Sequence, residues 1–90
     1  MNLVKTDRKQ NGSNIYDVYH KEKIIGSVYK EYNKSGGAAY AKYVGHWEGY
    51  YNWRLDLDFV PVEKREYPDA DELYKEFDSL KELKIFLKDF

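Results

Sequence analysis

The clearest pattern in the chain is an alternation of apolar and polar residues over positions 50–60. The apolar residues of this segment are Tyr51, Trp53, Leu55, Leu57 and Phe59. Because successive side chains of a β-strand point to opposite faces, this period of two predicts a strand with one face in the core. The outer face of the same strand then carries Tyr50, Asn52, Arg54, Asp56 and Asp58.

The preceding segment, "AAYAKYVG", predicts a partner strand over 38–46, and the length of the connecting loop sets how the two strands pair. A two-residue turn would place Lys42 opposite Leu55 in the core, where an unpaired charge is costly. A three-residue loop over 47–49, with its glycine in the left-handed conformation, avoids this. We therefore expect Ala41 to lie opposite Leu55, with Lys42 on the outer face.

A hairpin precedes these strands. The segment "IYDVYHKEKIIGSVYKEY" is rich in Ile, Val and Tyr, which suit a pleated surface. It predicts strands over 15–20 and 24–32, joined by a tight turn near Lys21–Glu22. Such a turn places Val18 opposite Ile25. Before the hairpin, we expect only a short strand from Asn2 to Lys5, followed by a polar turn or a frayed arm.

The chain ends in a helix with a clear start signal. Ser79 and Glu82 form an S-x-x-E capping box, and an apolar stripe follows at helical spacing. The stripe consists of Leu80, Leu83, Phe86, Leu87 and Phe90, whereas Ile85 lies on the opposite side. The pattern predicts a helix over 79–90. For residues 69–77, a short helix and a strand from Leu73 to Phe77 both fit.

Together these elements predict an α+β fold in a single small domain over residues 1–90. Its antiparallel sheet has three to four strands, at about 15–20, 24–32, 38–46 and 50–60, with the C-terminal helix packed on one face. So small a core leaves little room for a deep, enclosed active site.

Composition narrows the classes of protein further. The chain has no cysteine, which excludes disulfides and thiolate chemistry, and no apolar run long enough for a signal peptide or a membrane span. We therefore expect a cytoplasmic protein. The net charge of −1 hides an asymmetry: residues 1–54 carry nine Lys or Arg and five acids, whereas residues 55–90 carry six and eleven.

Residue types used in catalysis are present but isolated. Asp56 and Asp58 could share one face of a strand, which is compatible with a divalent cation or an acid–base pair. Solvent-facing carboxylates are, however, ordinary on such a strand. His20 and His46 each stand alone, and no metal-ligand spacing, nucleophile motif or phosphate-binding loop occurs. We expect neither an enzyme nor a bound cofactor or metal.

The exposed aromatic residues indicate a binding role instead. The predicted partner-binding residues are Trp47, Tyr50, Tyr40, Arg54, Lys42, His46, Asp56 and Asp58, on the outer face and the hairpin tip. Tyr, Trp and Arg concentrate binding energy at protein interfaces. The same rings with Lys and Arg could bind single-stranded nucleic acid, but the carboxylates and the net negative charge disfavour it.

We therefore expect a small noncatalytic protein-interaction module, an inhibitor or adaptor of a larger protein. The size and the Tyr- and Lys-rich composition are typical of accessory proteins of phages and mobile elements. A homodimer formed through a sheet edge or face is also compatible with the pattern.

Overall fold

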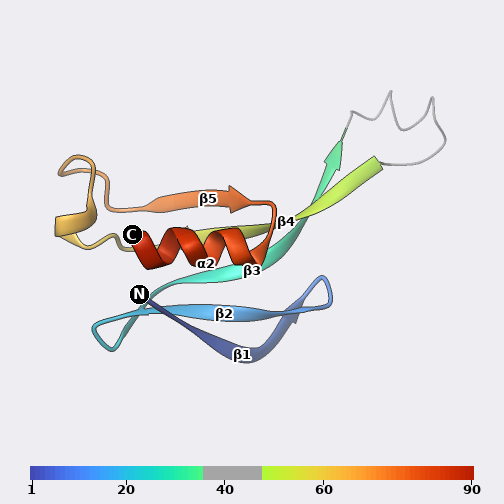
Figure 1. Cartoon of the computed structure of the whole chain (residues 1–90), viewed down its shortest axis with the longest axis horizontal. Coiled ribbons are helices and arrows are strands. Elements are labelled where there is room, and N and C mark those ends of the chain that lie inside the picture. Colours follow the sequence, from blue (N-terminus) through green and yellow to red (C-terminus); the bar gives the residue numbers. More distant parts are fainter. Residues whose placement is uncertain (36–47) are drawn as a thin grey trace.

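A computed structural model of the chain describes residues 1–35 and 48–90 (Figure 1). Among these residues, five strands form one antiparallel sheet in sequence order: β1 (Asn2–Gln10), β2 (Ser13–His20), β3 (Lys23–Ser35), β4 (Glu48–Leu57) and β5 (Leu73–Phe77). A 3₁₀ turn, η1 (Val62–Lys64), lies between β4 and β5, and the helix α2 (Leu80–Asp89) follows β5. The predicted α+β fold with its antiparallel sheet is confirmed, with more strands than expected.

The helix α2 covers one face of the sheet, here called the helix side; the opposite face is the outer face. The Ser79 hydroxyl accepts a hydrogen bond from the Glu82 backbone amide at 3.2 Å, so the predicted cap and helix are confirmed. The core lies between α2 and the sheet and consists of Val18, Ile25, Val28, Leu55, Leu57, Val60, Leu83 and Leu87. Ile85 points away from it and is exposed, as predicted.

The N-terminal segment forms a complete hairpin, so the expected end of the strand at Lys5 and the frayed arm are wrong, although the polar segment does contain a turn. β1 continues to Gln10, and a two-residue turn at Asn11 and Gly12 leads into β2. Both turn residues have positive φ, at 52° and 81°. Asn-Gly is the residue pair that two-residue hairpins prefer, because such turns need positive φ at both central positions. The sequence carried this signal.

The second hairpin turns at Lys21 and Glu22 as predicted, but its register is shifted. Pairing begins as expected next to the turn and then slips by one residue at an irregularity between Val18 and Tyr19. Val18 therefore faces Gly26 and not Ile25. The extra residue is typical of a β-bulge, which no local sequence pattern predicts.

β4 lies at the centre of the later half of the sheet. Leu55 has Val28 of β3 on one side and Lys75 of β5 on the other, so the predicted pairing of Leu55 with Ala41 is wrong. The predicted strand 38–46 itself lies wholly outside the described residues. The segment Leu73–Phe77 is a strand, which decides between the two alternatives for residues 69–77.

The alternation along β4 holds only in its central part. Leu55 and Leu57 are buried, and Trp53 is half-buried. Phe59 was expected in the core but is exposed, because β4 ends at Leu57 and the chain bends as the amides of Asp58 and Phe59 both donate to the Ile25 carbonyl. Tyr51 is exposed for a different reason: it lies beyond the last residue of β4 that pairs with β5.

The strands β3 and β4 extend beyond their neighbours as a two-stranded arm, formed by residues 31–35 and 48–52 (Figure 1). β2 last pairs with β3 at Val28, and β5 last pairs with β4 at Trp53. Where the arm begins, the side-chain amides of Gln10 and Asn11 donate to the Lys30 carbonyl at 3.2 and 2.9 Å. The first hairpin turn thus satisfies a carbonyl that β2 no longer reaches.

We expect Gly26→Ala to lower the free energy of unfolding by about 2–3 kcal/mol, because a Cβ there would overlap the β4 backbone at Asp56 and Leu57. Gly49→Ala is the matched control: its Cβ would meet only the ring end of Tyr32, which can rotate away. Urea unfolding of both variants tests this. Equal losses would contradict the close approach of β3 and β4 at Gly26.

Candidate binding surfaces of the sheet

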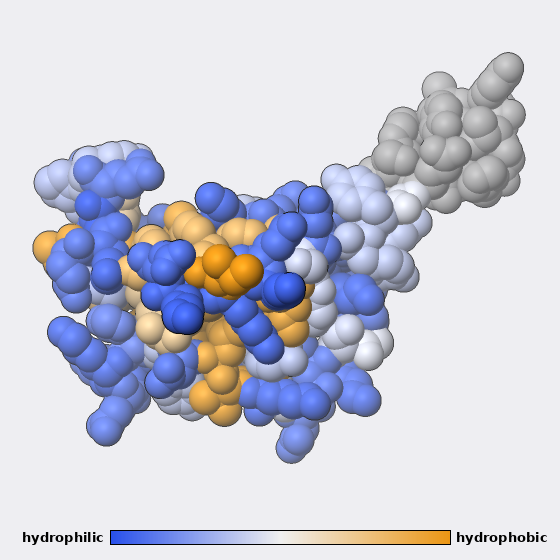
Figure 2. Space-filling model, in the orientation of Figure 1, coloured by the Kyte–Doolittle hydropathy of each residue, from blue (hydrophilic) through white to orange (hydrophobic). Residues whose placement is uncertain are grey.

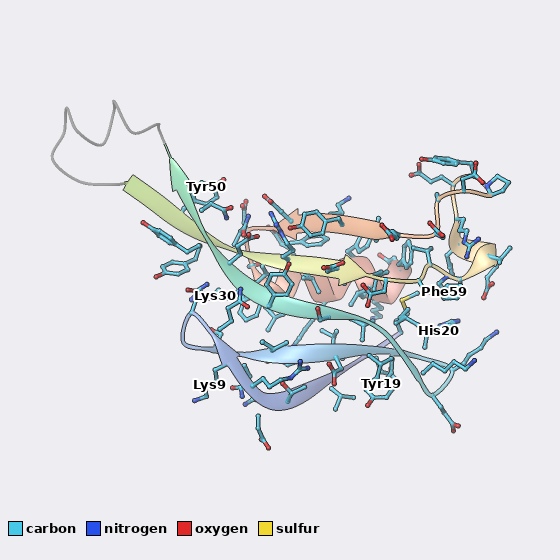
Figure 3. The ribbon with its side chains drawn as sticks, turned by 180° about the vertical axis from the view of Figure 1, so that it is seen from behind. Lys9, Tyr19, His20, Lys30, Tyr50 and Phe59 are labelled. Atoms are coloured by element: carbon cyan, nitrogen blue, oxygen red, sulfur yellow. The ribbon has the colours of Figure 1, made fainter. Side chains whose placement is uncertain are left out.

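Half of the predicted partner-binding residues lie in the described part of the chain. Tyr50 is 54% exposed on the arm (Figure 3), Asp56 is half-buried in β4, and Asp58 is exposed in the bend after it. Arg54 lies on the outer face as expected, yet only 9% of it is exposed. The other predicted residues, Tyr40, Lys42, His46 and Trp47, lie outside the described residues.

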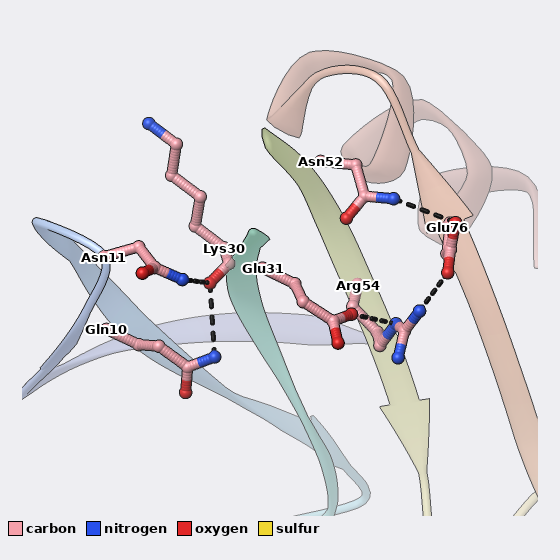
Figure 4. Close-up of polar contacts among 7 residues, drawn as sticks. All are labelled: Gln10, Asn11, Lys30, Glu31, Asn52, Arg54 and Glu76. Atoms are coloured by element: carbon pink, nitrogen blue, oxygen red, sulfur yellow. Dashed lines mark hydrogen bonds and ion pairs between the residues drawn. The ribbon is translucent and has the colours of Figure 1, made fainter. Parts of the chain in front are cut away.

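Arg54 is buried because three neighbouring side chains surround its guanidinium, and Figure 4 shows two of them, Glu31 and Glu76. Its Nε lies 2.7 Å from Oε2 of Glu31, in the geometry of an ion pair, not of an aligned hydrogen bond. Its Nη2 donates to Oε1 of Glu76. The Tyr74 ring covers the remaining face, with its centroid 4.1 Å from Cζ, a distance at which a cation and an aromatic ring attract.

Strand pairing brings these residues together from three strands. Arg54 pairs with Tyr29 of β3 and with Glu76 of β5. Its side chain therefore lies between two carboxylates, Glu31 on β3 and Glu76 on β5. Asn52, one step along the same face, donates to Oε2 of Glu76 at 2.8 Å and is 4% exposed. The outer-face cluster is defined as Glu31, Asn52, Arg54, Tyr74 and Glu76.

Arg54 carries the positive charge of the cluster at neutral pH. Burial of the guanidinium lowers the pKa of Arg54, but the hydrogen bond to Glu76 and the nearby charge of Glu31 outweigh it, so the pKa lies above its ordinary value. One cation therefore faces two carboxylates. The surplus negative charge makes the cluster suited to a partner that supplies a further positive group.

Tyr29 lies next to the cluster and extends it toward Asp56. Burial and the Asp56 carboxylate raise the pKa of the Tyr29 phenol above its ordinary value, although Arg54 acts in the opposite direction. The phenol thus keeps its proton at physiological pH. Tyr29 is the direct cross-strand partner of Arg54.

Sequence reasoning missed Tyr29, Glu31, Tyr74 and Glu76. Each belongs to a strand whose pairing with β4 was unknown, and a charged residue beside an aromatic one is common on any solvent-facing strand. The available signal was the alternation of "LYKEF", which places Tyr74 and Glu76 on one face. Only the register of β5 against β4 shows that this face meets Arg54.

A smaller polar group lies at the opposite end of the sheet from the arm. Nε2 of His20 and Nζ of Lys21 lie 3.8 and 4.0 Å from a Glu63 carboxylate oxygen. A hydrogen bond from its own backbone amide lowers the pKa of Glu63, and the charge of Lys21 acts in the same direction. These contacts tie the η1 turn to the second hairpin and show no arrangement of nucleophile and base.

Two further observations concern residues 1–35 and 48–90. Within them, no group of three or more His, Asp or Glu side chains is placed to hold a metal ion. No helix in this part of the chain combines the length and the apolar character needed to cross a membrane.

We expect Arg54→Ala to lower the free energy of unfolding by about 2–4 kcal/mol, because it leaves two carboxylates facing each other without their cation. Arg8→Ala is the control, since Arg8 makes a similar 2.8 Å ion pair with Asp17 but is largely exposed. It should cost less than about 1 kcal/mol. Chemical unfolding of both variants measures the difference, and similar losses would show that the cluster contributes little.

We expect the free energy of unfolding to fall in alkali as the Tyr29 phenol loses its proton. Because its phenol has a raised pKa in the folded state, the stabilisation is complete below the ordinary tyrosine pKa of about 10 and declines as pH rises above it. In an absorbance titration of phenolate, Tyr29→Phe should remove a tyrosine that titrates late. A titration curve that loses an ordinary tyrosine instead would contradict this environment.

Comparison with known proteins gives no family for this chain. No protein-family model, no curated protein and no solved structure matches it. Its function must therefore be inferred from its own surfaces.

Proposed function

We propose that the chain is a small noncatalytic protein-interaction module, an inhibitor or adaptor that binds a larger protein through the outer face of its sheet. One observation carries this proposal. The outer face bears two exposed tyrosines, Tyr50 and Tyr74, beside a charged cluster that is already held in place. Among the described residues no helix packs on this face.

The rigidity of the cluster supports binding to a protein. Glu31 and Glu76 hold Arg54, and Arg54 in turn holds the Tyr74 ring, so these groups lose little freedom when a partner docks. Tyrosine adds a large contact area with few rotatable bonds. Tyr50 and Tyr74, at 54% and 58% exposed, are the aromatic residues available as anchors in this region.

The charge of the face indicates the chemistry of the partner. Strand pairing and the ion pair of Arg8 with Asp17 place six charged residues on the outer face, two cations against four carboxylates: Arg8, Asp17, Glu31, Arg54, Asp56 and Glu76. A complementary partner surface would carry Lys or Arg around an apolar centre. Trp47, Tyr40, Lys42 and His46 remain part of the proposed surface, although they lie outside the described residues.

The test compares capture of proteins by matched variants. Tagged wild type, the double variant Tyr50→Ala/Tyr74→Ala and the control Tyr51→Ala are incubated with nuclease-treated lysate, and captured proteins are quantified by mass spectrometry. Tyr51 is 53% exposed but lies on the helix side, so the control removes an equal ring from the other face.

We expect a defined protein to be captured by wild type and by Tyr51→Ala, and at least fivefold less by the double variant. With that protein purified, the Kd should rise about tenfold or more, as expected for loss of central aromatic anchors. Capture that is equal for all three chains would contradict binding through the outer face.

A further inference from the structure

Charge is divided between the two sides of the sheet in a way that the net charge conceals. The helix side carries the lysines Lys5, Lys30, Lys75, Lys81, Lys84 and Lys88. Two carboxylates, Glu82 and Asp89, accompany them on α2. Figure 2 views this side, where hydrophilic side chains flank the apolar residues over α2. Lysines therefore outnumber carboxylates on α2 and the strand positions of the helix side, whereas carboxylates outnumber cations on the outer face.

Helical periodicity separates the two signs on α2 itself. Lys81, Lys84 and Lys88 follow the i, i+3, i+7 spacing of one stripe, and they border a shallow hollow with Leu80 and Ile85. The stripe leans toward β2, because Lys84 lies 6.0 Å from the centroid of the Tyr16 ring. Glu82 and Asp89 lie about a quarter-turn further round the helix, away from that stripe.

The arm continues this side with two exposed tyrosine rings. Tyr32 and Tyr51 are directly paired across the strands, with ring centroids 5.0 Å apart and planes tilted by 52°. They are 38% and 53% exposed. Gly49 has no side chain to push the Tyr32 ring outward, so the ring lies close over the strand backbone. These rings form no part of the core.

A row of neighbouring residues, which passes over Trp53, leads from the rings to the lysine stripe. Nζ of Lys30 lies 4.8 Å from the Tyr51 ring centroid, and Lys30 pairs with Trp53. The Trp53 and Tyr16 rings meet edge to face with their centroids 6.3 Å apart, and Nζ of Lys84 lies 6.0 Å from the centroid of the Tyr16 ring. The lysine–tyrosine track is defined as Tyr32, Tyr51, Lys30, Tyr16, Lys84, Lys81 and Lys88.

We propose that the lysine–tyrosine track binds single-stranded nucleic acid without sequence preference. Bases stack on Tyr32 and Tyr51, because every base offers a flat aromatic face. The lysines along the track hold the phosphates as point charges. Binding is therefore weak, salt-dependent and tolerant of sequence. This activity uses the side of the sheet opposite to the proposed protein-binding face.

The chemistry favours a single strand over other anions. An acidic peptide would use the lysines but has no need of exposed paired rings. A duplex keeps its bases stacked inside, so it too would leave the tyrosines unused. The outer face would repel a phosphate backbone through its carboxylates, which confines nucleic acid to the helix side.

Fluorescence anisotropy with labelled oligothymidylate and oligouridylate of about twelve nucleotides tests the proposal. We expect wild type to bind with a Kd of about 1–100 µM at physiological salt, and log K to fall with log salt at a slope of about −2, as three phosphate contacts would give. A duplex of the same length should bind less tightly at each salt concentration.

Neighbouring residues on β4 supply the matched variants. Tyr51→Ala should weaken binding at least fivefold and Tyr51→Phe should restore it, as loss and return of one stacking ring require. Tyr50→Ala, equally exposed on the opposite face, should leave the Kd unchanged. The triple variant Lys81→Gln/Lys84→Gln/Lys88→Gln should flatten the salt slope, and thermal unfolding confirms that each variant is folded.

Several results would overturn the proposal. Wild type that binds neither oligonucleotide at low salt contradicts it, as does equal weakening by Tyr50→Ala and Tyr51→Ala. Competition by polyglutamate together with full binding by Tyr51→Ala would show a general polyanion surface instead. Because Tyr50 and Tyr74 take no part here, failure of this inference leaves the proposed protein binding untouched, and the converse also holds.

Discussion

In the described part of the chain, one ten-residue helix covers one face of a five-stranded sheet, and this limited apolar cover governs the rest of the structure. The second face of β4 has no helix to pack against, so its central residue cannot be apolar without exposing that surface to water. The residue at this position is Arg54, whose charge is paired with carboxylates from both neighbouring strands. Polar contacts on one face and Leu55 and Leu57 on the other then hold β3, β4 and β5 in one register.

Sequence reasoning succeeded where a signal was local and failed where it depended on distant pairing. The capping residue Ser79 and the stripe behind it determine α2, because both lie within a few residues of each other. The register of the second hairpin could not be predicted, because the irregularity at Val18 depends on packing across strands. The Asn11–Gly12 turn was predictable but was overlooked among the polar residues around it.

The candidate surface was predicted only in part for the same reason. Tyr50 and Arg54 were identified from the alternation of one strand, but the state of Arg54 depends on Glu31 and Glu76, which are 23 and 22 residues away in sequence. Net charge was similarly uninformative. It averages two sides of a sheet that carry opposite sign, and only the pairing of strands assigns each lysine and carboxylate to its side.

The hydrogen bonds from Gln10 and Asn11 to the Lys30 carbonyl have a consequence for how the sheet opens. They stand where β3 goes from two neighbouring strands, β2 and β4, to β4 alone, so they separate a core that unfolds as a unit from an arm that can lose its backbone hydrogen bonds alone. We therefore expect fraying of the far end of the arm, residues 32–35 and 48–51, to stop at Glu31 and Asn52, which the outer-face cluster holds, and not to spread into Val28 and Leu55. Such fraying changes the end of the arm while the core stays folded.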